Sequence, residues 1–400
     1  MPIVEDRAYL DHAATTPMLP AAREAWLEQS ALLGNPSSLH TSGRRARRAV
    51  EEAREAIAGL LRVRPSAVVF TSGGTEADNL AVKGLYWARR RDAGATRILA
   101  SAIEHHAVLD PLEWLAAEQG AQIDWLAVDE VGRVSADEVA RRLADGPTAA
   151  LCTVMWANNE IGTVQPIAAI AEVCRAAGVP MHTDAVQALG HVPVDLGAVG
   201  VDAATITSHK IGGPYGVGAL IVDPRLSLTP VLHGGGQERD VRSGTVDAAA
   251  VAGFAVAVAH AVSGQQARAD HLLALRTSLV EGIRAAVPDA VVNGDLGPGP
   301  EERLPGNVHV SFPGCEGDLM LMLLDAAGID CSTGSACTSG VPEPSHVLLA
   351  MGVGNDLARS SLRFSLGESS SQADVDRVVA VLPGAVDRAR RAGSLAVQVR

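Results

Sequence analysis

Aromatic residues are scarce in this 400-residue sequence, in which Phe, Trp and Tyr together make up only 3%. Ala, Val, Leu and Gly fill the apolar positions instead, a composition that suits helices packed closely against a sheet. Hydrophobic residues reach 47% and charged residues 20%, as in ordinary globular proteins. The length exceeds what one compact core usually needs, so we expect two domains.

A basic surface is also lacking, because the formal net charge at pH 7 is −13. Nucleic acids and anionic membranes favour positively charged proteins, so we expect neither as a partner. The longest apolar run, Ala248 to Ala259, is shorter than the roughly 20 residues that cross a bilayer, and we predict a buried helix there. We recognise no secretory signal in Met1 to Arg7.

Closely spaced cysteine pairs are absent as well. The cysteines lie far apart and form no C-x-x-C motif; they are Cys152, Cys174, Cys315, Cys331 and Cys337. This spacing suggests neither a zinc site nor a disulfide framework. We therefore expect a reducing, cytoplasmic location and no bound metal.

Short apolar runs recur through the first half of the chain, and each is followed by a turn and a helical pattern. The runs predicted as strands are Val68 to Phe70, Arg97 to Ala100, Ala149 to Met155, Val179 to His182, Ala203 to Thr207 and Gly218 to Val222. Strands that alternate with helices predict an α/β fold, with a mostly parallel central sheet and helices on both of its faces.

The pattern changes after about residue 255, where helices are longer and strands are more loosely spaced. We expect a large domain over residues 18–255. Residues 1–17 together with 256–400 are predicted to form a smaller α+β domain that carries Cys337.

Two polar residues at predicted strand ends point to a carbonyl cofactor. Lys210 stands between small residues and a Gly-Gly-Pro turn, and a neutral lysine amine forms Schiff bases. Asp184 ends an apolar strand and could pair with the protonated pyridine nitrogen of pyridoxal phosphate (PLP). Taken alone, Lys210 could be a surface lysine and Asp184 could cap a following helix. Their shared position at one sheet edge favours the cofactor site.

A phosphate-binding segment is predicted at Thr71 to Glu76, between a strand and a helix. Its backbone N–H groups and hydroxyls could converge on a phosphate at the helix N-terminus, although a simple capped turn is the alternative. It matches neither the P-loop nor the dinucleotide-binding motif. Thr207 and His209 could add donors, and His105 could stack on a flat cofactor ring.

Cys337 lies among small, hydroxylated and proline residues between Cys331 and Pro344, which is the composition of an exposed loop. An accessible thiol can act as a thiolate nucleophile, although most isolated cysteines are inert. Cys331 follows the apolar residues 327–329 and is predicted to be buried.

Together these segments resemble the cysteine desulfurases of the class V aminotransferase superfamily, which are PLP enzymes of fold type I. The resemblance covers nearly the whole chain and rests on an ordered set of motifs: Tyr9-Leu10-Asp11, Ala14-Thr15-Thr16-Pro17, Gly34-Asn35-Pro36-Ser37-Ser38, Thr71-Ser72-Gly73-Gly74-Thr75-Glu76, Glu104-His105, Asn158-Asn159-Glu160-Ile161-Gly162, Asp184 with Gln187, Ser208-His209-Lys210, His233-Gly234-Gly235-Gly236-Gln237-Glu238-Arg239, Arg242-Ser243-Gly244-Thr245, Gly334-Ser335-Ala336-Cys337 and Arg363-Phe364-Ser365-Leu366-Gly367.

The resemblance implies a role for each matching residue. Lys210 would hold the cofactor as a Schiff base and move protons, with Asp184 on the pyridine nitrogen and His105 stacked on the ring. The remaining cofactor contacts would come from Gln187 and Asn159 at the ring oxygen, from Gly74, Thr75, Thr207 and His209 at the phosphate, and from Thr245 of the neighbouring subunit of a homodimer. Asn35 and Arg363 would bind the substrate carboxylate.

The implied activity is removal of sulfur from L-cysteine, which gives L-alanine and a persulfide on Cys337. The sulfur would pass to an acceptor protein, such as an iron–sulfur scaffold or a thiolation protein. A selenocysteine lyase or another class V aminotransferase is the alternative enzyme, and a non-catalytic thiol carrier is a third hypothesis. The small departures from the family pattern, at His106, Thr207 and Gly74, keep size or hydrogen-bonding capacity.

Overall fold

The computed structural model describes residues 7–299, 301–333 and 344–398. Cys337 and most of its predicted loop lie outside the described residues. The helices and strands of the first part are β1 (Ala8–Tyr9), α1 (Pro20–Ser30), α2 (Thr41–Leu60), η1 (Pro65–Ala67), β2 (Val68–Thr71), α3 (Gly74–Ala93), β3 (Arg97–Ser101), α4 (His106–Gln119), β4 (Gln122–Leu126), α5 (Ala136–Ala144), β5 (Ala149–Thr153), α6 (Ile167–Ala176), β6 (Met181–Asp184), α7 (Leu196–Val199), β7 (Ala203–Thr207) and β8 (Gly218–Val222). Those of the second part are η2 (Glu238–Asp240), α8 (Ala248–Val262), α9 (Gln265–Ala286), β9 (Val291–Asn293), β10 (Asn307–Ser311), α10 (Gly317–Ala326), β11 (Ile329–Asp330), α11 (His346–Ala350), α12 (Asn355–Arg359), β12 (Ser361–Ser365) and α13 (Gln372–Gln398).

A seven-stranded sheet organises the first part of the chain, with the strand order β2-β8-β7-β6-β5-β3-β4. From β7 to β4 all neighbouring strands are parallel, whereas β8 is antiparallel to both β7 and β2. The predicted mostly parallel sheet is therefore confirmed. The carboxyl ends of β2, β3, β5, β6 and β7 meet at one edge, so side chains that follow these strands are brought together.

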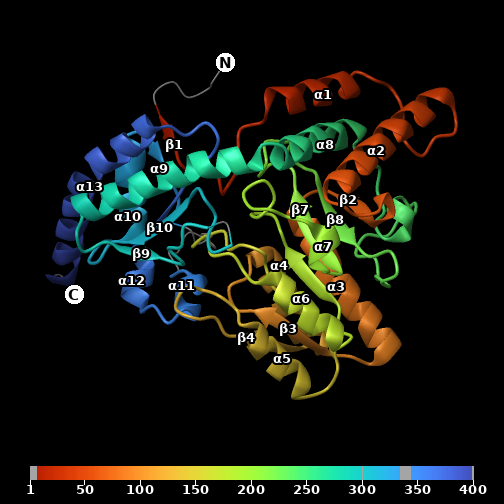
Figure 1. The fold of residues 1–400 in the computed structure, drawn as a ribbon, viewed down its shortest axis with the longest axis horizontal. Helices are drawn as coiled ribbons and strands as arrows, with labels where there is room; N and C mark the ends of the chain where they lie inside the picture. Colours follow the sequence, from red (N-terminus) through yellow and green to blue (C-terminus); the bar gives the residue numbers. More distant parts are fainter. Residues whose placement is uncertain (1–6, 300, 334–343, 399–400) are drawn as a thin grey trace.

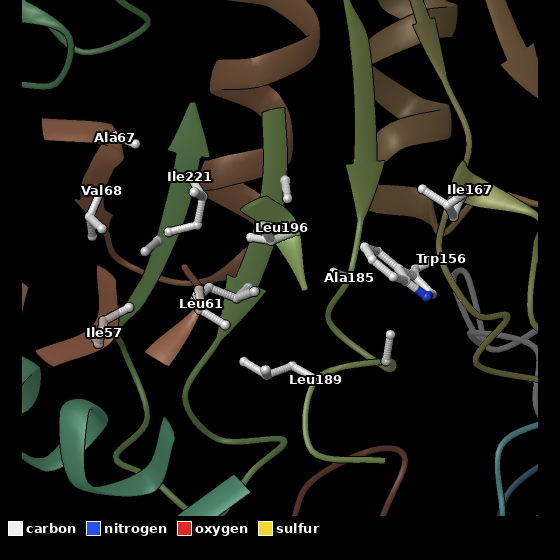
Figure 2. Packing of buried hydrophobic residues seen from close by; sticks show 14 of the residues in the cluster. Ile57, Leu61, Ala67, Val68, Trp156, Ile167, Ala185, Leu189, Leu196 and Ile221 are labelled. Carbon is white, nitrogen blue, oxygen red and sulfur yellow. The ribbon is translucent and has the colours of Figure 1, made fainter. Parts of the chain in front are cut away.

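Helices cover both faces of this sheet because the side chains of each buried strand alternate between them. On β3, Leu99 packs into a core with α2, α6 and α8, whereas Ile98 and Ala100 pack against α3 and α4. Figure 2 shows part of the first core, including Ile57 of α2 and Leu61 directly after that helix. The strands read as continuous apolar runs because both of their faces are buried.

A second core surrounds the antiparallel sheet β12-β10-β9. It joins Ala8 and Leu10 from the start of the chain to residues of α9, α10 and α13, and β1 pairs in parallel with β11. Figure 1 shows this group of elements at one side of the seven-stranded sheet, with α8 beside α1 and α2 and α9 within the group. The predicted domain limits, 18–255 against 1–17 with 256–400, stay a prediction.

The predicted strands are all present, with bounds that differ by at most two residues. Within the seven-stranded sheet, β4 was not predicted. It pairs only with β3 at the sheet edge, and its side chains at Gln122 and Trp125 are exposed, so it lacks the apolar run of a buried strand. The predicted buried helix at residues 248–259 is confirmed as α8, which packs against α1 and α2.

Within the described part of the chain, no single helix has the length and apolar character needed to cross a membrane. Only α8 and α9 taken together reach that length and composition, and they are bent by 69° where they meet.

The outer edge of β2 is covered by a buried ion pair. The Arg54 guanidinium of α2 binds both carboxylate oxygens of Glu238, at 2.7 and 2.8 Å. Glu238 also accepts the Phe70 N–H at 2.8 Å, and Arg54 donates to the Val68 carbonyl at 2.7 Å. The free backbone groups of an edge strand are thereby bonded within the chain, which prevents pairing with another sheet.

This ion pair also holds a strained turn. Glu238, Arg239 and Asp240 have φ angles of 35°, 57° and 62°, a left-handed conformation that residues other than glycine rarely adopt. Such strain costs about 1–3 kcal/mol per residue and persists only where the surroundings enforce it. The Arg54–Glu238 contacts supply that constraint.

Candidate active site

A cavity of about 380 Å³ opens at the carboxyl edge of the seven-stranded sheet. Its lining includes Ala13, Ala14, Gly74, Thr75, Asp78, His105, Ala107, Met155, Asn159, Asp184, Val186, Gln187, Thr207, His209, Lys210, Ser332 and Arg363. Ten of the residues predicted for the site therefore line one cavity. They come from the carboxyl ends of β6 and β7, from segments that follow β2, β3, β5 and β7, and from β12 of the second sheet.

A larger cavity of about 670 Å³ lies at the opposite edge of the sheet. Two of its arginines are paired with neighbouring carboxylates, Arg62 with Asp195 at 2.6 Å and Arg225 with Asp223 at 2.5 Å. None of the predicted site residues that the structure describes lines it. The chemistry therefore belongs to the smaller cavity.

Lys210 follows β7 and its amine is held at the cavity wall. The Nζ group donates to the carbonyls of Ala13 at 2.5 Å and Ala14 at 2.7 Å. Burial lowers the pKa of Lys210 to about 8, and the Arg363 charge acts in the same direction. Near pH 8 a large share of this amine is uncharged and nucleophilic. The only other lysine of the sequence is Lys83 of α3, which lies over the Trp114 ring, 4.7 Å from its centroid.

Asp184 is the last residue of β6 and only 5% exposed. Burial raises the pKa of its carboxyl to about 6, although the Val186 N–H bond and the Lys210 charge oppose the shift. The Val186 N–H donates to Asp184 Oδ1 at 2.8 Å, within a turn. No helix follows directly among these described residues, so the alternative of Asp184 as a helix cap is wrong.

The segment after β2 presents the N-terminus of the long helix α3 to the cavity. Gly73 has φ +153°, which favours glycine, and Gly74 and Thr75 begin the helix and line the cavity. A Cβ atom on Gly74 would lie 3.1 Å from Val186 Cγ2, so a small residue fits best there. The first N–H groups of a helix have no intrahelical partner and carry partial positive charge, which suits an anion.

Two histidines flank Lys210. His105 precedes α4 and its Nδ1 accepts the Ala107 N–H at 3.1 Å, which fixes the ring at the cavity wall. His209 stacks against Tyr215, with ring centroids 5.7 Å apart. Burial within the concave site, together with the Lys210 charge, lowers the pKa of each histidine to about 4. Both rings are therefore neutral near pH 7.

Arg363 of β12 crosses from the second sheet into the cavity. It is 5% exposed and pairs with Asp11, Nη2 to Oδ1, at 2.8 Å. Its Nη1 donates to the Asn159 carbonyl at 3.1 Å, while its buried Nε has no hydrogen-bond partner among the described residues. A buried guanidinium with a free N–H at a cavity is suited to binding a carboxylate.

Two predicted residues do not line this cavity, and a third falls outside the described residues. Asn35 is exposed in the turn before α2, where its Oδ1 accepts the Ser37 N–H at 2.8 Å. Thr245 is also exposed, and Cys337 lies outside the described residues. Cys331 is buried as predicted, and burial raises the pKa of its thiol to about 12.

Sequence reasoning missed three residues at the site: Asp11, Asp78 and Met155. Asp11 forms the ion pair with Arg363, and Asp78 and Met155 line the cavity. Asp78 comes three residues after Thr75 and four after Gly74. Residues three or four positions apart lie on the same face of a helix, so Asp78 is expected on the face of Gly74 and Thr75. That spacing was the available signal for it.

Comparisons with known proteins establish the family of the chain. Residues 8–378 match the family model described as "Aminotransferase class-V". The chain is 56% identical over 386 residues to an "IscS-like cysteine desulfurase" of Mycobacterium tuberculosis, a match that covers 96% of this chain and 98% of the relative.

Solved structures show the same fold over most of the chain. One is the "NifS-like protein from Rickettsia africae ESF-5", with a TM-score of 0.85, 32% identity, and coverage of 96% of this chain and 100% of that one. Another is "SspA in complex with cysteine", with a TM-score of 0.78, 33% identity, and coverage of 92% and 100%. The fold is that of the PLP-dependent transferases of fold type I, and the predicted resemblance is confirmed. The chain belongs to the aminotransferase class-V family.

Proposed function

We propose that this protein is a cysteine desulfurase, which converts L-cysteine and a cysteine thiol of the enzyme into L-alanine and an enzyme persulfide. The proposal rests on one cavity that brings three groups together: the Lys210 amine with its lowered pKa, the buried carboxyl of Asp184 and the buried guanidinium of Arg363. The relatives named as cysteine desulfurases support the choice of reaction.

The residues of the cavity fit PLP as cofactor. Lys210 offers a nucleophilic amine for the aldehyde, and the N-terminus of α3 with Gly74, Thr75, Thr207 and His209 offers a cradle for the phosphate. When bound, PLP draws electrons away from the α-carbon of an attached amino acid. Asp184 supports this by facing the pyridine nitrogen with a carboxylate.

The remaining residues orient the cofactor and the substrate. His105 is neutral and stands at the cavity wall, where its ring can stack on the pyridine ring. Gln187 donates one amide hydrogen to the Ala13 carbonyl at 2.9 Å, and the other, like the side chain of Asn159, is available to the ring oxygen. Arg363 lines the cavity, where its guanidinium binds the substrate carboxylate. Lys210 moves a proton at the α-carbon.

Sulfur transfer needs a thiolate that can reach the substrate, and we assign it to Cys337. This thiolate attacks the substrate sulfur, an S–S bond forms, and the Cβ–S bond breaks. The electron pair of that bond goes to Cβ, which takes a proton as alanine forms. Cys331 is unsuited to this role, because burial raises its pKa to about 12 and keeps the thiol protonated.

A homodimer and a sulfur acceptor complete the proposal. Thr245 and Asn35 are exposed and lie outside the cavity of their own chain, so a neighbouring subunit is where they can act. Exposed leucines around the end of α1 offer apolar surface for such an association; they are Leu27, Leu32, Leu33 and Leu39. An iron–sulfur scaffold or another thiolation protein in the cytoplasm is the proposed acceptor.

Persulfide mapping tests the proposal. The protein with PLP is incubated with L-cysteine, and the persulfide is located by mass spectrometry in the wild type, Lys210→Ala and Cys337→Ala. We expect persulfide on Cys337 in the wild type and on no cysteine of either variant, with one alanine formed per sulfur. Cys331→Ala is the matched control and should keep the persulfide. Persulfide on Cys331, or full sulfide release by Cys337→Ala, would contradict the assignment.

The selenocysteine lyase and aminotransferase alternatives give different products. A lyase would turn over selenocysteine but not cysteine, and an aminotransferase would yield a keto acid with no need for Cys337. Product analysis of the same incubations separates the three activities.

The pKa of Lys210 predicts how PLP capture by the cofactor-free protein depends on pH. Burial lowers this pKa to about 8, and only the uncharged amine attacks an aldehyde. The capture rate, followed by visible absorbance, should therefore rise with pH and level off once the pH exceeds about 8. Lys83→Ala should show the same curve. A rate that keeps rising through pH 10 would mean that the Lys210 amine has an ordinary pKa.

A further inference from the structure

A chain of buried polar side chains lies behind Asp184 and crosses three neighbouring strands. His182 of β6 lies 2.9 Å from the Thr153 hydroxyl of β5, Nδ1 to Oγ1, and 3.0 Å from the Thr205 hydroxyl of β7, Nε2 to Oγ1. Thr205 in turn hydrogen-bonds to the Asp78 carboxyl of α3. All four side chains are at most 1% exposed, and none has a role in the proposed reaction so far.

This chain can be oriented in two ways, because a neutral imidazole has one N–H and one acceptor nitrogen. Burial lowers the pKa of His182 to about 3, so its ring is neutral. If Asp78 carries a proton, it donates to Thr205, Thr205 donates to His182 Nε2, and His182 Nδ1–H donates to Thr153. If Asp78 is ionised, every bond in the chain runs the other way and His182 carries its proton on Nε2.

The charges around Asp78 favour the first orientation. Asp78 and Asp184 line the same cavity, and two neighbouring buried carboxyls cannot both be ionised at low cost. Burial raises the pKa of Asp78 well above its usual value, and the Asp184 and Glu104 charges add to this effect, which outweighs the opposing hydrogen bond with Thr205. Asp184 alone has the stabilising Val186 N–H and the Lys210 charge.

One further contact fits a protonated Asp78. Its Oδ1 lies 3.5 Å from His182 Nε2 and has no hydrogen-bond partner among the described residues. A buried carboxylate oxygen left without a donor is costly, whereas an uncharged carboxyl tolerates this arrangement.

We propose that Asp78 is a positioning residue that keeps a proton at the end of the Thr153–His182–Thr205 chain and thereby leaves the negative charge on Asp184. The benefit for catalysis rests on the proposed PLP site, because the charge of Asp184 is the one that faces the pyridine nitrogen. The position of the proton does not depend on the cofactor.

The tautomer of His182 reports the orientation of the chain. Nitrogen-15 NMR of the imidazole, assigned through its coupling to the backbone, is recorded with and without PLP between pH 6 and 8. We expect the Nδ1–H tautomer in both states. The Nε2–H tautomer in either state would overturn the proposal, and because the cofactor-free protein is measured too, this result is separate from any failure of the PLP assignment.

A pair of matched variants tests the charge. Asp78→Asn removes no charge if Asp78 is already neutral, so PLP affinity should change by less than about threefold and the pH midpoint of the visible absorbance should stay in place. Asp184→Asn removes the charge itself and should weaken PLP binding by about tenfold or more. A shift of the midpoint in Asp78→Asn by about one pH unit or more would show that Asp78 is charged and overturn the proposal.

Discussion

Lys210→Ala is expected to lower cysteine turnover by about 10³-fold or more, because it removes both the nucleophile that holds the cofactor and the group that moves the α-proton. The fold should survive, since among the described residues the hydrogen bonds of the Lys210 amine go to backbone carbonyls, those of Ala13 and Ala14. Alanine production and visible absorbance after PLP addition measure the effect. Circular dichroism should be unchanged.

Lys83→Ala is the matched control, because it makes the same substitution at the only other lysine of the sequence. Lys83 contacts the Trp114 ring on α4 and lines no part of the cavity. Turnover should stay within about twofold of the wild type, as for a surface contact of about 0.5–1 kcal/mol. Full activity of Lys210→Ala, or a comparable loss in Lys83→Ala, would contradict the proposed role of Lys210.

Glu238→Ala is expected to reduce the free energy of unfolding by about 3–5 kcal/mol, because it leaves a buried guanidinium without its counterion. Arg54 and Glu238 have side chains that are 5% and 3% exposed, so water cannot replace the missing carboxylate. The Phe70 N–H at the sheet edge also loses its acceptor, and the left-handed turn at residues 238–240 loses its anchor. Chemical denaturation measures the change.

The control for this prediction is Glu172→Ala, which breaks the exposed pair with Arg175 on α6. Those side chains are 70% and 60% exposed, and such pairs contribute about 0–1 kcal/mol. Equal stability of the two variants would mean that the Arg54–Glu238 pair contributes no more than a surface pair.

Much of the site was predictable because the chain places its polar residues directly after apolar strands. Asp184 and Thr207 end β6 and β7, and Lys210 follows three residues later. The carboxyl ends of parallel strands share one edge, so local patterns alone brought these residues to one place. The motifs that carry the family resemblance added His105, Asn159 and Gln187, which local reasoning could not distinguish from structural residues.

Contacts between distant segments were not predictable. Asp11 and Arg363 are 352 positions apart, and Arg54 and Glu238 are 184 apart, so no periodicity links them. The strand β4 was missed since an exposed edge strand lacks the apolar run of its neighbours. The role implied by resemblance for Thr245 concerns a second subunit, which patterns within one chain do not describe. Asn35 was expected beside Arg363 at the substrate carboxylate, but it does not line the cavity that Arg363 lines.

The scarcity of lysine has a practical consequence. With Lys83 and Lys210 as the only two lysines, growth on lysine labelled with nitrogen-15 at Nζ would give a spectrum with two side-chain signals. The signal lost in Lys83→Ala identifies the other as Lys210. The Lys210 amine at the cavity wall can therefore be titrated directly. Its response to PLP, cysteine or an acceptor protein can be followed in the same spectrum, where the Lys83 signal, 127 positions away in the sequence, is the internal reference.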